Sequence, residues 1–122
     1  MGMYSGVARD NVTITSGNIT VQRFRNTNNS PVTKTASFTL GADENFVICN
    51  GTGSITVTFP AASTAPGRVV WIKTIAAQTV VSASSNVVPA NSATAGTAIL
   101  ADTAGVWAML VSNGTNWVIM AN

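Results

Sequence analysis

The feature that most constrains this chain is a regular alternation of β-branched or aromatic residues with polar ones. The run SITVTFP, from Ser54 to Pro60, is the clearest case, because it places Ile55, Val57 and Phe59 on one face and threonines on the other. Similar short runs, separated by turn residues roughly every ten positions, continue along the chain. This spacing is typical of short β-strands that are buried on one face.

No segment has the 3.6-residue periodicity of a helix, and the alanine-rich stretch 83–104 is interrupted by proline, glycine and scattered hydroxyl residues. The chain therefore predicts an all-β fold, an antiparallel β-sandwich or jelly-roll-like domain. The polar run RNTNNSPVT, Arg25 to Thr33, divides it. We predict an N-terminal arm or accessory strands over residues 1–34 and a sandwich body over 35–122. Whether the N-terminal strands stay within one subunit or reach a neighbour is left open.

The composition limits the classes of protein that fit. The chain has 122 residues, which corresponds to one domain, and only 8% of them are charged. A charge content this low indicates either that Thr, Ser and Asn keep the surface solvated or that partners cover much of it. We expect no membrane-spanning helix and no secretion signal, because neither kind of apolar segment is present. The single cysteine, Cys49, lies in the apolar run NFVIC and is expected to be a buried, inert thiol.

The residues needed for catalysis are missing. The chain has no histidine and four carboxylates, of which Asp43 and Glu44 are adjacent and so point to opposite faces of an extended segment. Cys49 lacks a histidine to activate it, and the glycine-containing NGTGS turn lacks the lysine of a phosphate-binding loop. We therefore expect a non-enzymatic protein with no catalytic residue, no cofactor and no metal.

The chain closes with LVSNGTNWVIMAN, Leu110 to Asn122, where Asn113-Gly114 predicts a hairpin turn. A two-residue loop pairs Leu110 with Trp117, and a four-residue loop gives the same two faces. One face then carries Val106, Ala108, Leu110, Trp117 and Ile119. The other carries Trp107, Met109, Val111, Val118 and Met120.

Both faces of this hairpin are apolar, whereas an antiparallel sheet usually has one polar, solvated face. One face can fill the sandwich core, and the other requires a second cover. We expect that cover to be another copy of the chain. The predicted oligomer interface is formed by Trp107, Met109, Val118 and Met120.

Positive charge is concentrated near the N-terminus. Residues 1–35 contain four cationic side chains and one aspartate, Asp10, whereas the remainder is nearly neutral. The four cations are Arg9, Arg23, Arg25 and Lys34. They fit either a solvated segment or an arm that docks on an acidic partner surface. The net charge of +2 is too small to suggest nucleic-acid binding.

The tryptophans Trp71, Trp107 and Trp117 have two possible roles. They can pack in the core and in an interface, since indole rings bury large areas. Alternatively, an exposed indole can stack on a sugar. Because Trp107 and Trp117 fall on opposite faces of the hairpin, at most one of them is expected to be so exposed.

Four features of residues 36–120 resemble a module of tailed-bacteriophage structural proteins. A strand ends in Phe59-Pro60, Gly67 follows a short loop, Ile72-Lys73 lies in the next strand, and the segment closes with LVSNGTNW, Leu110 to Trp117. Proteins similar to this are trimeric β-structured decoration proteins of phage heads and domains of head and tail fibres. The resemblance implies a non-enzymatic, threefold-symmetric virion protein and carries over no catalytic residue.

Under this resemblance we expect a capsid decoration (cement) protein on the outer surface of the virion, with the major capsid protein as its partner. The short chain and its basic N-terminal segment favour decoration over a fibre. Arg9, Arg23, Arg25 and Lys34 are then the candidate capsid contacts. The alternative is a receptor- or glycan-binding module of a head fibre or tail fibre, which would bind a host-surface glycan. Neither alternative calls for nucleic acid or a membrane as a partner.

Overall fold

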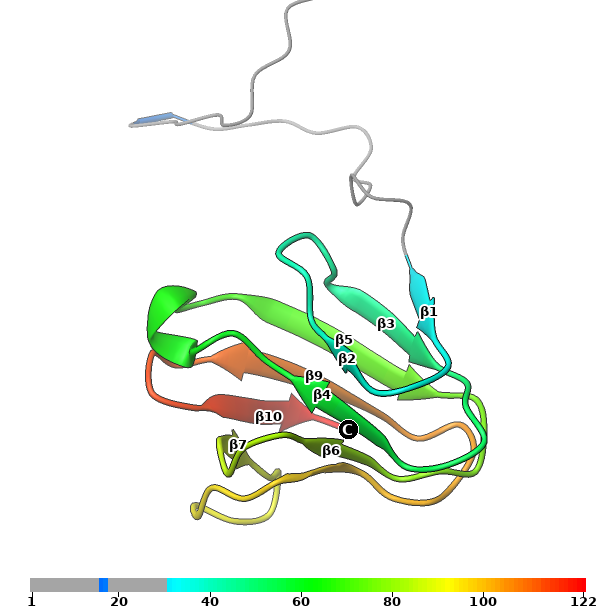
Figure 1. The fold of residues 1–122 in the computed structure, drawn as a ribbon. Coiled ribbons are helices and arrows are strands. Elements are labelled where there is room, and N and C mark those ends of the chain that lie inside the picture. The colour runs from blue at the N-terminus through cyan, green and yellow to red at the C-terminus, as the bar shows by residue number, and fades with distance from the viewer. Residues whose placement is uncertain (1–15, 18–30) are drawn as a thin grey trace, which may run out of the picture.

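The computed structural model describes residues 16–17 and 31–122, and the second of these ranges forms two β-sheets that pack together as a sandwich (Figure 1). The larger sheet has six strands in the order β1-β3-β5-β9-β10-β7. These are β1 (Val32–Lys34), β3 (Phe46–Cys49), β5 (Val69–Thr74), β9 (Trp107–Ser112), β10 (Trp117–Ala121) and β7 (Val87–Val88). The smaller sheet has four strands, β2 (Phe38–Thr39), β4 (Ile55–Thr58), β6 (Val80–Ser82) and β8 (Ala98–Leu100). The helical content of the described part is one 3₁₀ turn, Ala62–Thr64.

The chain crosses from one sheet to the other after every strand from β1 to β8, whereas β9 and β10 form a hairpin within the large sheet. Among β1 to β6, strands that are next but one in sequence lie side by side and run in the same direction. Thus β1, β3 and β5 pair in parallel in the large sheet, and β2, β4 and β6 do so in the small sheet. The all-β sandwich is confirmed, but both sheets are mixed and the expectation of purely antiparallel pairing was wrong. Each parallel crossover is made by a strand of the opposite sheet, a route that alternation alone does not reveal.

The core lies between the two sheets and is built by the period-two pattern. Ile55, Val57 and Phe59 are buried on one side of β4, as the sequence predicted. In β5 the buried residues are Val70, Ile72 and Thr74, and the residues between them are exposed. The strand β5 is central in the large sheet, flanked by β3 and β9, but it is covered on one side only.

The closing hairpin has a four-residue loop, because Ser112 pairs with Trp117. The Oδ1 atom of Asn113 accepts hydrogen bonds from the backbone N–H groups of Thr115 and Asn116, at 2.9 and 2.8 Å, and Gly114 has φ of 89°. This turn replaces the two-residue type I′ loop, and Leu110 pairs with Ile119 instead of Trp117. The predicted division into two faces is confirmed, since the alternate residues of β9 and β10 on one side are buried and those on the other are not.

The sandwich begins at β1, which pairs with β3 from Val32 to Lys34. These three residues belong to the large sheet, although the sequence analysis grouped them with the N-terminal segment. The structure does not describe most of that segment, so the predicted arm lies outside the described residues. Within the described ranges, no helix is long and apolar enough to cross a membrane.

Candidate interaction surface

The side of the six-stranded sheet that points away from the small sheet, here called the outer face, is largely apolar from β3 to β7. The strand registers align its residues in three rows. The first row is Thr33, Ile48, Lys73 and Trp107. The second is Phe46, Trp71 and Met109, with Met120 at its end. The third is Val69, Val111, Val118 and Val88.

Large hydrophobic side chains are exposed on this face. Phe46, Trp71 and Trp107 each keep slightly more than a third of their surface accessible, and Met120 keeps 62%. Val69 lies on the same face, and Ile75, the remaining large exposed hydrophobic residue of the described chain, follows β5 directly. The exposed apolar surface of the described chain is thus gathered on one sheet face, which marks an interaction site.

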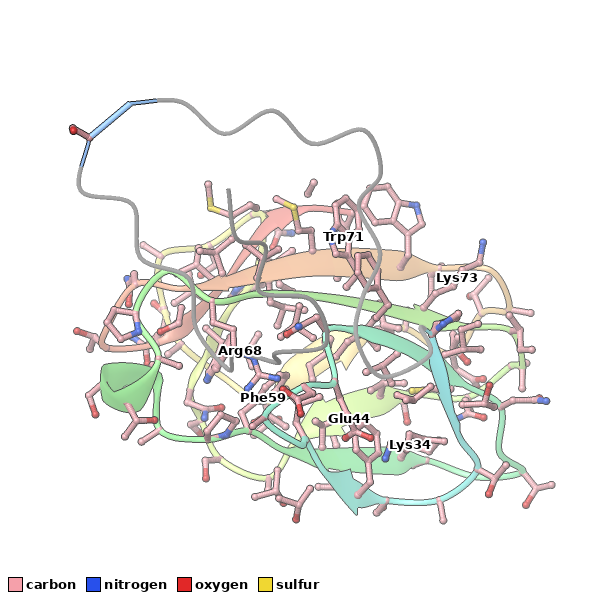
Figure 2. The ribbon with its side chains drawn as sticks, turned by 90° about the horizontal axis from the view of Figure 1, so that it is seen from above. Lys34, Glu44, Phe59, Arg68, Trp71 and Lys73 are labelled. Atoms are coloured by element: carbon pink, nitrogen blue, oxygen red, sulfur yellow. The ribbon has the colours of Figure 1, made fainter. Side chains whose placement is uncertain are left out.

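Two of these residues, Trp71 and Trp107, stack with their ring centroids 5.6 Å apart and an interplanar angle of 26°. Trp71 and Lys73 project away from the sandwich, whereas Phe59 lies between the sheets (Figure 2). Beside the indole pair is a pocket of about 270 Å³. It is lined by Pro31, Phe46, Val47, Ile48, Trp71, Ile72, Lys73 and Trp107.

Lys73 is the one charged residue in the three rows of the outer face. Its strand neighbours on that face, Trp71 and Ile75, are apolar. A partner surface that lies against this face therefore meets hydrophobic side chains and a single cation.

Two of the four motifs that carry the phage resemblance meet in space. Trp117 is fully buried, stacks on Phe59 at 5.0 Å, and donates a hydrogen bond from Nε1 to the carbonyl of Pro60 at 3.0 Å. Ser112 donates from Oγ to the carbonyl of Ala62 at 2.7 Å. The loop after β4 and the closing hairpin therefore hold each other in place. Trp117 has a packing role and is not accessible to a sugar.

The loop between β2 and β3 is fixed by charged side chains. Arg68 donates from Nη2 to the carbonyls of Gly41 and Glu44, at 2.7 and 3.0 Å, and from Nε to Oδ1 of Asn45 at 3.1 Å. The Nζ atom of Lys34 lies 2.7 Å from Oε2 of Glu44 (Figure 2). Hydrogen bonds from Lys34 and from the Gly41 N–H lower the pKa of the Glu44 carboxyl. This network stabilises the loop at the edge of the large sheet.

Of the four predicted capsid contacts, the structure describes Lys34 alone. Arg9, Arg23 and Arg25 lie outside the described residues. Lys34 lies in β1, where it pairs with Glu44 and sits 5.0 Å from the centre of the Phe38 ring. Its contact with a capsid stays a prediction.

The predicted interface residues Trp107, Met109, Val118 and Met120 all lie on the outer face. The sequence analysis missed Phe46 and Trp71, which extend that face beyond the hairpin. The sequence feature that could have identified this side of the strand as exposed is Lys73, which lies two residues after Trp71 in the same strand. A charged side chain on one side of an otherwise apolar strand indicates that this side is not part of the core.

Cys49 is fully buried, as the sequence predicted, and its burial raises the pKa of the thiol to about 11. A thiol with a pKa this high is almost entirely protonated at neutral pH and is a weak nucleophile. Among the described residues, no three histidine, cysteine, aspartate or glutamate side chains lie close enough together to hold a metal ion.

No protein-family model, curated protein or solved structure matches this chain. The function is therefore inferred from the outer face and from the motifs of residues 36–120.

Proposed function

We propose that this protein is a homotrimeric virion structural protein that decorates the outer surface of a tailed-bacteriophage head. The observation that carries the proposal is the outer face, a largely apolar surface over β3, β5, β9, β10 and β7 that contains one charged residue. The resemblance of the Phe59-Pro60 and Leu110 to Trp117 motifs to phage modules supplies the class of structure. The low share of charged residues, 8%, supports a surface that is largely covered by other subunits.

The outer face is large enough to be divided between two neighbouring copies. Six strands at about 4.8 Å spacing and rows covering about five residues at 3.3 Å give a face of roughly 500 Å². In a closed ring each copy shares this face between two neighbours, so one contact buries on the order of 500 Å² from the two copies together, and the three contacts of a trimer bury on the order of 1,500 Å². An exposed apolar patch of several hundred Å² is often an interaction site. The outer face is therefore assigned to contacts between copies of the chain.

Binding to the head is assigned to the basic N-terminal segment. A capsid lattice presents local threefold positions, where one trimer can bridge neighbouring subunits. A ligand that binds the assembled lattice, and not its dissociated subunits, stabilises the lattice by mass action. Arg9, Arg23 and Arg25 supply positive charge for an acidic capsid surface, whereas the fourth predicted contact, Lys34, is paired with Glu44.

The test is the occupancy of expanded capsids that lack this protein, measured by co-sedimentation with the full chain and with a variant lacking residues 1–30. The truncated chain should remain a trimer and lose capsid binding. A full-length variant in which Arg9, Arg23 and Arg25 are replaced by alanine keeps the chain length and should bind more weakly, with a smaller dependence on salt. Unchanged capsid occupancy by both variants would contradict the assignment to the head.

A second candidate function, binding of a host glycan as part of a fibre, is favoured by the stacked pair Trp71 and Trp107. Their rings are more than a third exposed and lie beside a pocket, an arrangement on which a sugar ring can stack. Under this alternative the outer face stays accessible in the assembled protein. Binding to host cells or their polysaccharide would then be abolished in Trp107→Ala, whereas the proposed decoration function predicts no such binding by the unaltered protein.

A further inference from the structure

We infer that Met120 of one copy inserts into the pocket between Phe46, Trp71 and Trp107 of the next copy, so that the trimer is closed by three identical contacts. This inference rests on the proposed trimer and specifies how its subunits meet. The partner is a second copy of the chain, because the outer face carries both the projecting side chain and the pocket that suits it.

The pocket fits a flexible apolar side chain that contains sulfur. Phe46, Trp71 and Trp107 supply three aromatic rings, and Ile48 supplies an aliphatic wall. A thioether makes favourable contacts with aromatic rings, and the unbranched methionine side chain adapts to irregular pockets. Lys73 is the charged residue of the lining, and its long alkyl stem can remain against the apolar wall while its ammonium group reaches solvent.

Met120 projects from the sheet in a way that suits insertion. At 62%, it is the most exposed large hydrophobic residue of the described chain. The β9–β10 register shifts between Ile119 and Ala121, so Met120 occupies a bulge. Bulges bend a strand and redirect a side chain. Met120 is therefore more accessible to a neighbouring copy than the other large hydrophobic residues of the outer face.

The pocket and Met120 occupy different places on the outer face. The pocket is lined by residues of β3, β5 and β9, and its Phe46 wall on β3 is three strands away from Met120 on β10. A subunit can thus offer its pocket to one neighbour and its Met120 to the other. Contacts between two different patches produce a ring when the rotation between subunits closes. Such contacts allow a threefold ring with a single kind of interface.

A pair of cysteines tests this contact in the full chain. Phe46→Cys and Met120→Cys are combined, and the oxidised protein is separated by denaturing electrophoresis without reductant. Positions 46 and 120 are three strand spacings apart in one subunit, about 14 Å, which exceeds the limit of about 7 Å between the Cα atoms of a disulfide. Any disulfide between them therefore joins two subunits. The controls are the two single variants and Met120→Cys combined with Thr58→Cys, which lies on the small sheet.

Covalent trimers in the double variant, and only background in the controls, are the expected result. Covalent dimers without trimers would show a reciprocal twofold contact and overturn the ring. An intact trimer without cross-links would overturn the insertion of Met120 while the proposed trimer stands. A monomeric unaltered protein would overturn the inference together with the proposed function, and would leave a host glycan or residues 1–30 of the same chain as the cover of the outer face.

A second measurement does not depend on the cysteine variants. Met120→Ala removes the inserted side chain and should weaken trimer association by about tenfold or more, measured by light scattering over a dilution series. Ile75→Ala is the matched control, since Ile75 is 50% exposed and is not part of the pocket lining. Equal effects of the two substitutions would overturn a specific role for Met120.

Discussion

Trp117→Phe is the substitution that tests most sharply whether the phage-like hairpin motif is a packing device. The indole is fully buried, stacks on Phe59, and donates a hydrogen bond to the Pro60 carbonyl at 3.0 Å. Phenylalanine removes the donor and leaves that carbonyl unpaired, which costs about 1–3 kcal/mol. The smaller ring also buries about 50 Å² less apolar surface, about 1 kcal/mol at 25 cal/mol per Å². The expected loss in the free energy of unfolding is about 2–4 kcal/mol.

The assay is urea unfolding followed by circular dichroism, at one protein concentration because the stability of an oligomer depends on concentration. Ile75→Ala is the control, since it removes apolar surface from a half-exposed side chain that lies outside both the core and the pocket. Its expected effect is below about 1 kcal/mol. A loss of less than about 1 kcal/mol for Trp117→Phe, or equal losses in the two variants, would refute the reasoning.

Three further predictions concern single residues of the sandwich. Glu44→Gln should lower the free energy of unfolding by up to about 1 kcal/mol at pH 7. The pKa of Glu44 in the folded protein is lowered from its ordinary 4.5, so its contribution to stability is present above pH 4.5 and is lost as the pH falls through the lowered value. The unfolding curves of the unaltered protein and of Glu44→Gln should therefore converge in acid. The thiol of Cys49 should resist modification by maleimide at pH 7 until the protein unfolds, and rapid labelling of the folded protein would contradict this. The free energy of unfolding should also fall between about pH 9 and 11, because in that range the thiol ionises in the unfolded protein and stays protonated in the folded one. Gly51→Ala should lower the free energy of unfolding by about 1–3 kcal/mol, because the added Cβ would lie 2.6 Å from the carbonyl oxygen of Thr35. Gly53→Ala is the control and should have a much smaller effect in the same unfolding assay, because its Cβ would meet nothing within 4 Å.

The sequence predicted the strands well where alternation is clear. The run around Ile55 and Val57 forms β4 with the predicted face buried, and the closing hairpin divides as predicted. Alternation shows which side of a strand is buried, but it carries no information on which strand lies beside it. The parallel pairing of β3 with β5 arises from the path of the chain through the opposite sheet, so it could not be predicted from either segment alone.

The candidate surface could be predicted in part. The hairpin residues Trp107 and Met120 were identified because both faces of that hairpin are apolar. Phe46 and Trp71 were missed because an apolar strand in the middle of a sheet resembles one buried on both sides. Their position beside Trp107 depends on the registers of β3, β5 and β9, which only the three-dimensional structure supplies.

The central claim, that the outer face lies between copies of the chain, is tested most directly by the mass of the full protein in solution. Light scattering coupled to size-exclusion chromatography at micromolar concentration should give three times the 12.5 kDa mass of the chain. A mass equal to that of a single chain would contradict the claim.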